Sequence, residues 1–414
     1  MSKPVILTGI RANNDLTIGN YFGAILPIID MAKKRSDEFQ VNMFIPDLHS
    51  FTTPIDLSVL NEQIFHNAKV FVAAGLPLDI DSIYLYRQSY ISAHSELTLI
   101  LDCFTGFGEM GRMTQFKEKS ILNSYDLAKN LKKVYRLAYL RNNSLKEISV
   151  LAEFAKGNLE AVSRYKVQED EIDKSFDEYM ENNPHVLDDL MPNPEASVGL
   201  FNYPVLMASD ILLYNAKYVP VGDDQTQHLE FTRDIAERMN NKFGEIFTVP
   251  EAVKAQHQFF GKDQGLRIMD LIDPKKKMSK SDDSGRGVIF LSDEPIVAAK
   301  KVMGATTDDK AEINFDRANQ PGISNLLEIL SLLQGRTLQE VIDEFKGQTR
   351  YGEFKAVVAG EVEKFLTDFQ SRLANVDDHA IMAKIEQSEG DMTTVANATL
   401  LRAQQAVGLR PKVS

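Results

Sequence analysis

The sequence predicts an α/β protein that is built on a doubly wound parallel sheet, with a helical insert and a C-terminal all-helical domain. Three observations predict this. Short β-rich runs alternate with helically spaced apolar residues over positions 1–90, which is typical of βαβ units. A segment with strongly divided charge interrupts the pattern, and beyond Gly322 the pattern is almost entirely helical. Ligands of such sheets bind at the carboxyl ends of the strands, where the strand order switches.

The elements follow in order along the chain. The β-rich runs predict strands over 4–8, 41–45 and 82–86. Apolar residues at helical spacing predict helices over 19–34 and 57–74, the second of which ends before Gly75 and Pro77. Strand and helix signals resume over 203–214, 218–221 and 225–240.

Composition excludes several classes of protein. A chain of 414 residues is long enough for two or three domains. Its net charge of 46 − 59 = −13 argues against a generally basic, non-specific nucleic-acid binder, although a local basic patch remains compatible. The single cysteine, Cys103, rules out a disulfide framework and a cysteine-rich zinc site, and its apolar neighbours predict a buried thiol. No apolar run reaches the ~20 residues of a membrane span and no secretory signal is evident, so we expect a cytoplasmic protein without membrane contact.

Residues 121–196 form the predicted insert, which is divided by charge. Positions 129–166 hold nine Lys or Arg against three Asp or Glu, and positions 167–195 hold one Lys against ten Asp or Glu. The basic half could face the phosphates of a nucleic acid. Alternatively, the two halves neutralise each other within a self-contained helical hairpin.

Two motifs indicate phosphate chemistry. Thr17-Ile18-Gly19-Asn20 stands where a helix begins after a strand, and a helix N-terminus attracts phosphate. An ordinary turn with an N-cap threonine would look the same. The loop Lys275-Lys276-Lys277-Met278-Ser279-Lys280-Ser281 clusters ammonium and hydroxyl groups that suit a pyrophosphate leaving group. A merely solvated basic loop is the alternative, but the ordered Lys-Met-Ser-Lys-Ser run is rare.

Two further motifs could bind a nucleoside or a small substrate. Tyr203, Met207, Asp210 and Tyr214 recur at helical spacing, and a buried aspartate on such a stripe needs hydrogen-bond donors. A partly exposed aspartate beside a core stripe is equally compatible. Gly222-Asp223-Asp224 lies at a strand-to-helix junction, where carboxylates could hold ribose hydroxyls or simply favour the helix dipole.

The sequence shows no nucleophile or metal signature, and His94, His185 and His379 are interpreted as incidental. Carboxylate adenylation needs no enzyme nucleophile, because the substrate carboxylate attacks the α-phosphorus of ATP. The protein then has only to position the reactants and stabilise charge on phosphate.

Together, in this order and spacing, the motifs resemble the class I aminoacyl-tRNA synthetases, and within them the tryptophanyl-tRNA synthetase family. The blocks 112–120, 203–215 and 219–238 and the Arg267-Ile268-Met269 run are also similar to that family. The resemblance covers nearly all of the chain outside 121–196. It implies a Rossmann-like catalytic domain over 1–120 and 197–290, the insert over 121–196, and a helical tRNA-binding domain over 291–414. It further implies a homodimer that activates L-tryptophan with ATP and Mg²⁺ and transfers the tryptophanyl group to tRNA(Trp).

The resemblance also implies roles for individual residues. Catalysis would use three lysines: Lys117, Lys277 and Lys280. The ATP site would be lined by Arg11, Ala12, Asn13, Gly19, Asn20, Gly222, Asp223, Asp224, Ile268, Lys277, Met278, Ser279, Lys280 and Ser281. Asp210 would accept the indole N–H, and the rest of tryptophan would contact Tyr203, Met207, Val219, Val221 and Gln225. No protein metal site is implied, because Mg²⁺ would accompany ATP.

The chain departs from the family pattern at three places: Ala12, Asn13 and Asn14 replace the usual Pro, Ser or Thr, and Gly; Asp223 replaces a glutamate; and the insert is additional. Three alternatives remain: a tyrosyl-tRNA synthetase, a non-catalytic binding paralogue, and a small-molecule nucleotidyltransferase. The apolar Met207 argues against the first, the intact lysine loop against the second, and the helical C-terminal region against the third.

Overall fold

The computed structural model describes residues 3–9, 16–52, 55–114, 116, 174, 177–178, 197–222, 225–260, 268–278 and 285–412. The chain divides into two compact units, Met1–Gly106 with Asn202–Ser414, and Phe107–Phe201. Nearly all of the predicted insert, 121–196, lies outside the described residues. Among the helices that are described, none is both long and apolar enough to span a bilayer.

The first unit is organised around a parallel sheet of four strands in the order β3-β2-β1-β4. The strands are β1 (Val5–Gly9), β2 (Gln40–Ile45), β3 (Ile83–Arg87) and β4 (Ala216–Tyr218). The first three confirm the predicted strands, and Pro220, which has no N–H to donate, follows the short β4. The chain moves from β1 to β2 and β3 on one side and returns to β4 on the other. The switch point is therefore at the carboxyl ends of the paired strands β1 and β4.

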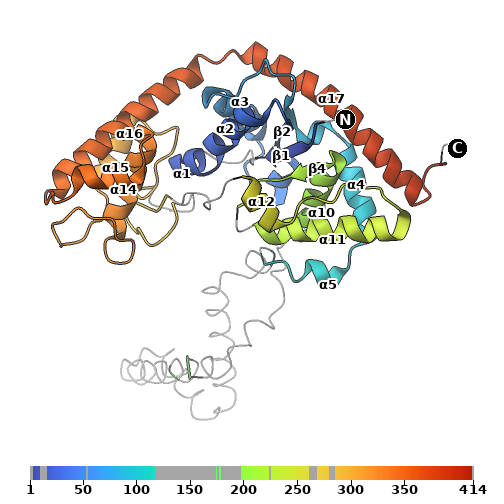
Figure 1. Ribbon diagram of the computed structural model, residues 1–414, viewed down its shortest axis with the longest axis horizontal. Coiled ribbons are helices and arrows are strands. Elements are labelled where there is room, and N and C mark those ends of the chain that lie inside the picture. The colour runs from blue at the N-terminus through green and yellow to red at the C-terminus, as the bar shows by residue number, and fades with distance from the viewer. Residues whose placement is uncertain are drawn as a thin grey trace, which may run out of the picture. The chain divides into compact units, whose positions relative to one another are not determined.

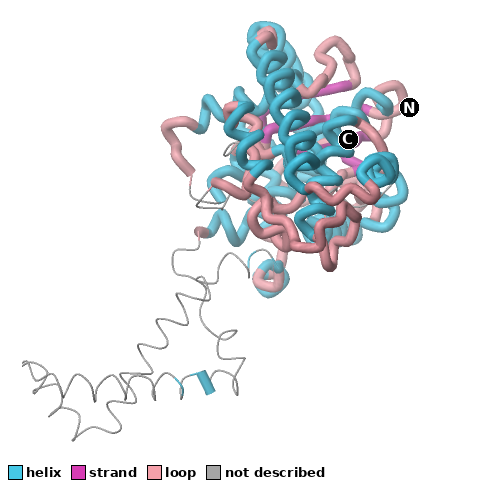
Figure 2. The backbone as a smooth tube through the Cα atoms, turned by 90° about the vertical axis from the view of Figure 1, so that its left-hand side faces the viewer, coloured by secondary structure: helices cyan, strands magenta, loops and turns pink. Residues whose placement is uncertain are grey.

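Helices enclose the strands, as Figures 1 and 2 show. Between the strands lie α1 (Ile18–Asn20), the π-helical turn η1 (Tyr21–Ile25), α2 (Leu26–Arg35), the 3₁₀ turn η2 (Leu48–Thr52), α3 (Leu60–Ala73), the 3₁₀ turn η3 (Gln88–Tyr90), α4 (Ala93–Asp102) and α10 (Val198–Leu213). After β4 come α11 (Thr226–Phe243), α12 (Val253–Phe259), α13 (Pro295–Met303), α14 (Pro321–Gln334), α15 (Leu338–Phe345), α16 (Tyr351–Ala374) and α17 (Asp378–Ala406).

The predicted helix over 19–34 is thus one helical run with a π turn inside it. The N–H of Leu26 donates to the carbonyl of Tyr21, five residues earlier. Pro27, which has no N–H, stands next in the chain at the start of α2. The change of register therefore coincides with the residue that cannot continue the α-helical hydrogen bonds.

The two faces of the sheet are buried differently. Ile6, Val41 and Met43 belong to a continuous apolar core that also takes in residues of α2, α3, α14 and α16. The other face carries aromatic contacts: the ring centroid of Tyr86 lies 5.9 Å from that of Phe44 and 5.4 Å from that of Tyr214, the residue after α10. Burial on both faces is typical of a parallel sheet, and the second face is the one that holds the site.

The long helix α17 covers the free edge of the sheet along β3 (Figure 1). The backbone N–H of Leu85 donates to Ser388 Oγ at 3.1 Å, and the N–H of Arg87 donates to Glu389 Oε1 at 3.2 Å. Arg87 Nε also pairs with Glu389 at 2.6 Å. Side chains of α17 therefore take the place of a further strand and protect this edge from pairing with another chain.

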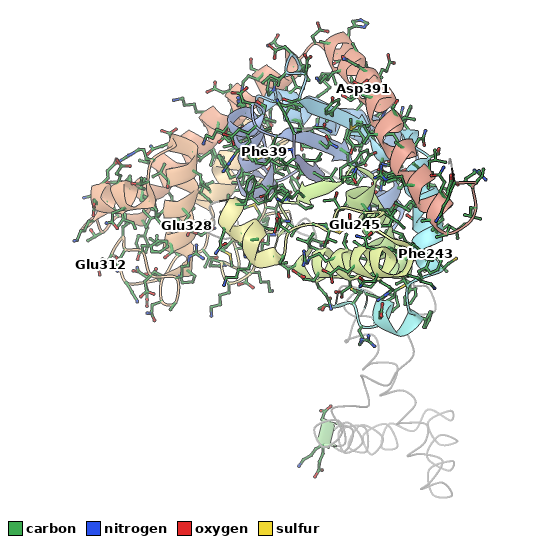
Figure 3. The ribbon with its side chains drawn as sticks, turned by 45° about the vertical axis from the view of Figure 1, so that its right-hand side comes forward. Phe39, Phe243, Glu245, Glu312, Glu328 and Asp391 are labelled. Carbon is green, nitrogen blue, oxygen red and sulfur yellow. The ribbon has the colours of Figure 1, made fainter. Side chains whose placement is uncertain are left out.

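Aromatic packing closes the ends of other helices. Phe39, labelled in Figure 3, lies with its ring centroid 5.1 Å from that of Phe259 on α12, which stacks at 3.7 Å on Tyr218 of β4. Phe243 at the end of α11 (Figure 3) packs against Phe104 at 5.2 Å. Beside Phe104, the thiol of Cys103 is exposed. The prediction of a buried thiol is therefore wrong, because Cys103 follows the last turn of α4 instead of facing inward.

The second unit is described only in part. It contains α5 (Phe107–Met110), and the rings of Phe107 and Phe116 lie 4.7 and 4.9 Å from that of Phe201. Only three residues between 117 and 196 are described: Lys174, Asp177 and Glu178.

Candidate functional site

A buried carboxylate, Asp210 on α10, is the centre of a polar cluster. Its Oδ1 accepts a hydrogen bond from Gln88 Nε2 at 2.7 Å and lies 2.7 Å from His94 Nδ1. Its Oδ2 lies 2.9 Å from His49 Nε2. His94 Nε2 in turn lies 2.8 Å from the hydroxyl of Tyr214. Asp210 is only 1% exposed, so each of these bonds forms away from water.

The donors come from the carboxyl ends of neighbouring strands. His49 follows β2, Gln88 follows β3, and His94 stands at the start of α4 directly beyond. Asp47 links the turn after β2 to the turn after β3, since it accepts from the backbone N–H of Leu48 at 3.0 Å and from that of Ser89 at 2.8 Å. The cluster thus lies at the strand ends where parallel sheets bind their ligands.

The helix α10, with Tyr214 directly after it, presents three of the predicted tryptophan residues and a second tyrosine in one row. Tyr203, Met207, Asp210 and Tyr214 are spaced by four, three and four positions, which places them on the same helical face. Tyr203 and Tyr214 are buried and Met207 is half-buried. The structure therefore brings the carboxylate and a thioether together on an otherwise apolar surface.

Opposing effects set the ionisation of Asp210. Burial alone raises its pKa, but the hydrogen bonds with His49 and His94 oppose burial and hold the pKa below the usual value of an aspartate. Burial raises the pKa of the Tyr214 hydroxyl well above its usual range. The cluster therefore combines a carboxylate anion with a phenol that keeps its proton.

The remaining predicted tryptophan residues lie directly after β4 and at the start of α11. The Tyr203 hydroxyl lies 2.9 Å from His228 Nε2 on α11. Gln225 is the N-cap of α11, and its N–H donates to the carbonyl of Gly222 at 2.9 Å. Val219, directly after β4, is buried, and Val221 is half-buried.

The first phosphate motif forms a short, well-capped helix start. Thr17 Oγ1 accepts from the N–H of Asn20 at 3.2 Å, and Asn20 Oδ1 accepts from the N–H of Thr17 at 3.0 Å. The carbonyl of the Asn20 side chain is thereby committed to the cap, which leaves the Nδ2 amide as the group that can donate outward. A Cβ on Gly19 would lie 3.7 Å from that of Ile268. Two predicted ATP residues that are distant in sequence are thus neighbours.

The base of the lysine loop is a small antiparallel pair of segments. Met269 pairs with Lys277, and the N–H of Met278 donates to the carbonyl of Ile268 at 3.0 Å. The side chain of Asn325 on α14 bonds both backbone groups of Met269. Its Oδ1 accepts from the N–H at 2.8 Å, and its Nδ2 donates to the carbonyl at 2.9 Å. Met278 is buried and Lys277 is exposed, so the loop is anchored through methionine and presents lysine to solvent.

Several predicted site residues lie outside the described residues, and their placement stays a prediction: Arg11, Ala12, Asn13, Lys117, Asp223, Asp224, Ser279, Lys280 and Ser281. The described residues of the chain hold no cluster of three or more His, Cys, Asp or Glu that could bind a metal ion.

The structure also reveals residues that sequence reasoning missed. His94 was expected to be incidental, but it contacts Asp210 directly and is completely buried. His49, Gln88 and His228 were not singled out. A signal for the first two was present, because polar residues that directly follow buried parallel strands gather at the ligand-binding edge of the sheet.

Comparisons with known proteins identify the family of the chain. The family "tRNA synthetases class I (W and Y)" matches residues 1–134 and 138–367. The Tryptophan–tRNA ligase of Caldanaerobacter subterraneus subsp. tengcongensis is 35% identical over 98% of this chain and 98% of its own length. The Tryptophan–tRNA ligase of Leifsonia xyli subsp. xyli is 36% identical over 98% of this chain and 97% of its own length. Among solved structures, tryptophanyl-tRNA synthetase from Mycoplasma pneumoniae is 28% identical, with a TM-score of 0.68 and 99% of each chain covered. The chain belongs to the class I tRNA synthetases for W and Y, and within them to the tryptophanyl-tRNA synthetase family.

Proposed function

We propose that Asp210 and the apolar row around it select tryptophan for the reaction of this family. The chain activates L-tryptophan with ATP to tryptophanyl-adenylate, releases pyrophosphate, and transfers the tryptophanyl group to tRNA(Trp). One observation supports the location of the site most strongly: a buried carboxylate that only accepts hydrogen bonds stands beside Met207 on an apolar helix face. This arrangement suits an apolar ring that carries a single N–H donor.

The surrounding residues would orient the rest of the amino acid. In this proposal Val219 and Val221 pack the indole ring together with Met207, while Tyr203 and Gln225 hold the amino and carboxylate groups. The contact between Tyr203 and His228 fixes the tyrosine ring before substrate arrives. A tyrosine substrate would place its phenol hydroxyl where this row offers the thioether of Met207, and a thioether is a weak hydrogen-bond acceptor.

ATP would bind across the switch point between β1 and β4. Gly19 and Asn20 lie in the segment after β1 with Ile268 beside them, and Gly222 follows β4, so the nucleotide would lie across the carboxyl ends of the two strands. The carboxylate of tryptophan attacks the α-phosphorus, and pyrophosphate leaves. Lys277, with Lys117 and Lys280, would neutralise charge on the departing pyrophosphate. We propose that Mg²⁺ arrives with the ATP phosphates, since magnesium is commonly held by substrate phosphates rather than by a protein cage.

The helices beyond the sheet would serve the second step. We propose that the C-terminal helices within 291–414 contact tRNA, that two copies of the chain form a twofold dimer, and that the enzyme works in the cytoplasm. Sedimentation of the chain with and without tRNA tests both the dimer and the complex.

The proposed selectivity is tested by ATP–pyrophosphate exchange with the wild-type chain and a Met207→Gln variant. We expect the wild type to exchange with tryptophan and not with tyrosine. The variant should lose at least about tenfold in kcat/KM for tryptophan, because an amide would be buried against the ring. Equal kcat/KM for tryptophan in both chains would show that Met207 does not face the substrate.

A further inference from the structure

Behind Asp210 lies a buried chain of hydrogen bonds that reaches no solvent. His94 stands in its middle, with Nδ1 2.7 Å from Asp210 Oδ1 and Nε2 2.8 Å from the Tyr214 hydroxyl. His94 is 0% exposed and Tyr214 is 1% exposed. Neither group is needed to attack, protonate or bind ATP, so the adenylation chemistry does not explain why they are buried together.

The direction of each hydrogen bond follows from the carboxylate. An ionised aspartate only accepts, so His94 must carry its proton on Nδ1. In the neutral imidazole Nε2 is then an acceptor, and the Tyr214 hydroxyl donates to it. Tyr214 therefore supports the tautomer of His94 that donates to Asp210, because its hydroxyl supplies the donor that Nε2 then needs. Such control of one ring nitrogen through the other is a common way to fix a histidine.

The two oxygens of Asp210 are not equivalent. Oδ1 accepts hydrogen bonds from Gln88 and His94, and these fill both of its acceptor positions. Within the described part of the chain, Oδ2 receives His49 alone. One acceptor position on Oδ2 is thus left for a ligand, provided that the carboxylate does not rotate about its terminal torsion, which is soft in aspartate.

We propose that His94 is a positioning residue for recognition of the indole N–H: it holds Asp210 Oδ1 and thereby keeps Oδ2 turned toward the substrate. The proposal rests on the proposed function of Asp210. Gln88, which follows β3, also donates to Oδ1. His94 differs from Gln88 because its ring is itself held by a second hydrogen bond, from the Tyr214 hydroxyl. Loss of His94 should therefore weaken selection for the N–H group more than it weakens binding of the ring.

The experiment compares two substrates that differ only at this group. L-3-(3-benzothienyl)alanine has the ring shape of tryptophan with sulfur in place of the N–H. The ratio of kcat/KM for tryptophan to that for this analogue, measured by ATP–pyrophosphate exchange, reports the N–H contact alone. For wild type we expect a ratio of about 10 to 100, as for a hydrogen bond to a charged group.

Three variants and one control separate positioning from general damage. His94→Leu removes both hydrogen bonds and should lower the ratio at least about fivefold. His94→Asn keeps a donor near the position of Nδ1, and Tyr214→Phe removes the hydroxyl that donates to Nε2 while the ring stays, so both should give intermediate ratios. Thr98→Val disturbs a buried hydroxyl one turn along the same helix, which donates to the carbonyl of His94 at 2.7 Å. The ratio in this control should match wild type.

Each result decides one claim. If the His94 and Tyr214 variants lose activity equally with both substrates, so that the ratio stays at the wild-type value, His94 is only structural and the inference is wrong. His94→Asn and Tyr214→Phe decide the question even if His94→Leu does not fold. If wild type itself does not distinguish the two substrates, the proposed role of Asp210 in reading the indole N–H fails instead.

Discussion

Replacement of Lys277 by alanine should slow adenylation without weakening tryptophan binding. The structure isolates this side chain well: Lys277 is exposed, and its neighbour Met278 carries the anchoring contacts of the loop. A surface change of this kind should leave Tm within about 2 °C of wild type. Two charges about 4 Å apart at an effective dielectric constant of about 20 interact by about 4 kcal/mol. We therefore expect kcat to fall by about 10² to 10³.

The assay is ATP–pyrophosphate exchange at saturating ATP, with kcat and KM for tryptophan measured separately. Lys276→Ala is the matched control, since Lys276 is also exposed but pairs with Asp273 at 3.0 Å. The control should lose less than about twofold in kcat, whereas Lys277→Ala should lose kcat at nearly constant KM. A Lys277→Ala chain that exchanges as fast as wild type, or that loses only tryptophan affinity, would refute the reasoning.

Three further predictions concern stability. Glu389→Ala leaves Arg87 without its partner in an ion pair whose side chains are 10% and 11% exposed. The variant should lose about 3 kcal/mol of unfolding free energy, measured by urea denaturation. An unchanged urea midpoint would show that α17 is not held through this pair. Because burial raises the pKa of Tyr214, the folded chain keeps that proton above pH ~10 and loses stability with rising pH, by about 1.4 kcal/mol per unit. In Tyr214→Phe, the free energy of unfolding should fall less steeply with pH above pH ~10 than in wild type. Equal slopes in the two chains would contradict this prediction. A Cβ on Gly287 would overlap the Asp270 carboxylate, so Gly287→Ala should cost about 1–3 kcal/mol and lower kcat by displacing the lysine loop; normal Tm and kcat would count against that.

Local patterns were sufficient to predict much of the fold. The strands over 4–8, 41–45 and 82–86 are present within a residue or so, because buried parallel strands are short apolar runs between turn residues. The helical region beyond Gly322 is likewise present. The π turn at Tyr21–Ile25 could not be predicted, since it depends on how Pro27 interrupts one particular helix.

The site was predicted only where its residues lie in one local pattern. The row containing Met207 and Asp210 is a helical repeat, so the sequence alone indicates it. The partners of Asp210 come from three other elements, and no local pattern joins His49, Gln88 and His94. Exposure of Cys103 was missed for a similar reason, because apolar neighbours do not say which side of a helix end faces the core.

The most direct test of the central claim is whether tryptophan itself binds at Asp210. The chain contains no tryptophan, so indole fluorescence reports added ligand without protein background. On titration with L-tryptophan, we expect saturable binding with emission shifted to shorter wavelength in the wild type and in Asp102→Asn, a half-buried aspartate of α4 bonded to Asn202 at 2.9 Å. Asp210→Asn should bind at least about tenfold more weakly. Equal affinity and the same shift in a folded Asp210→Asn chain would contradict the account.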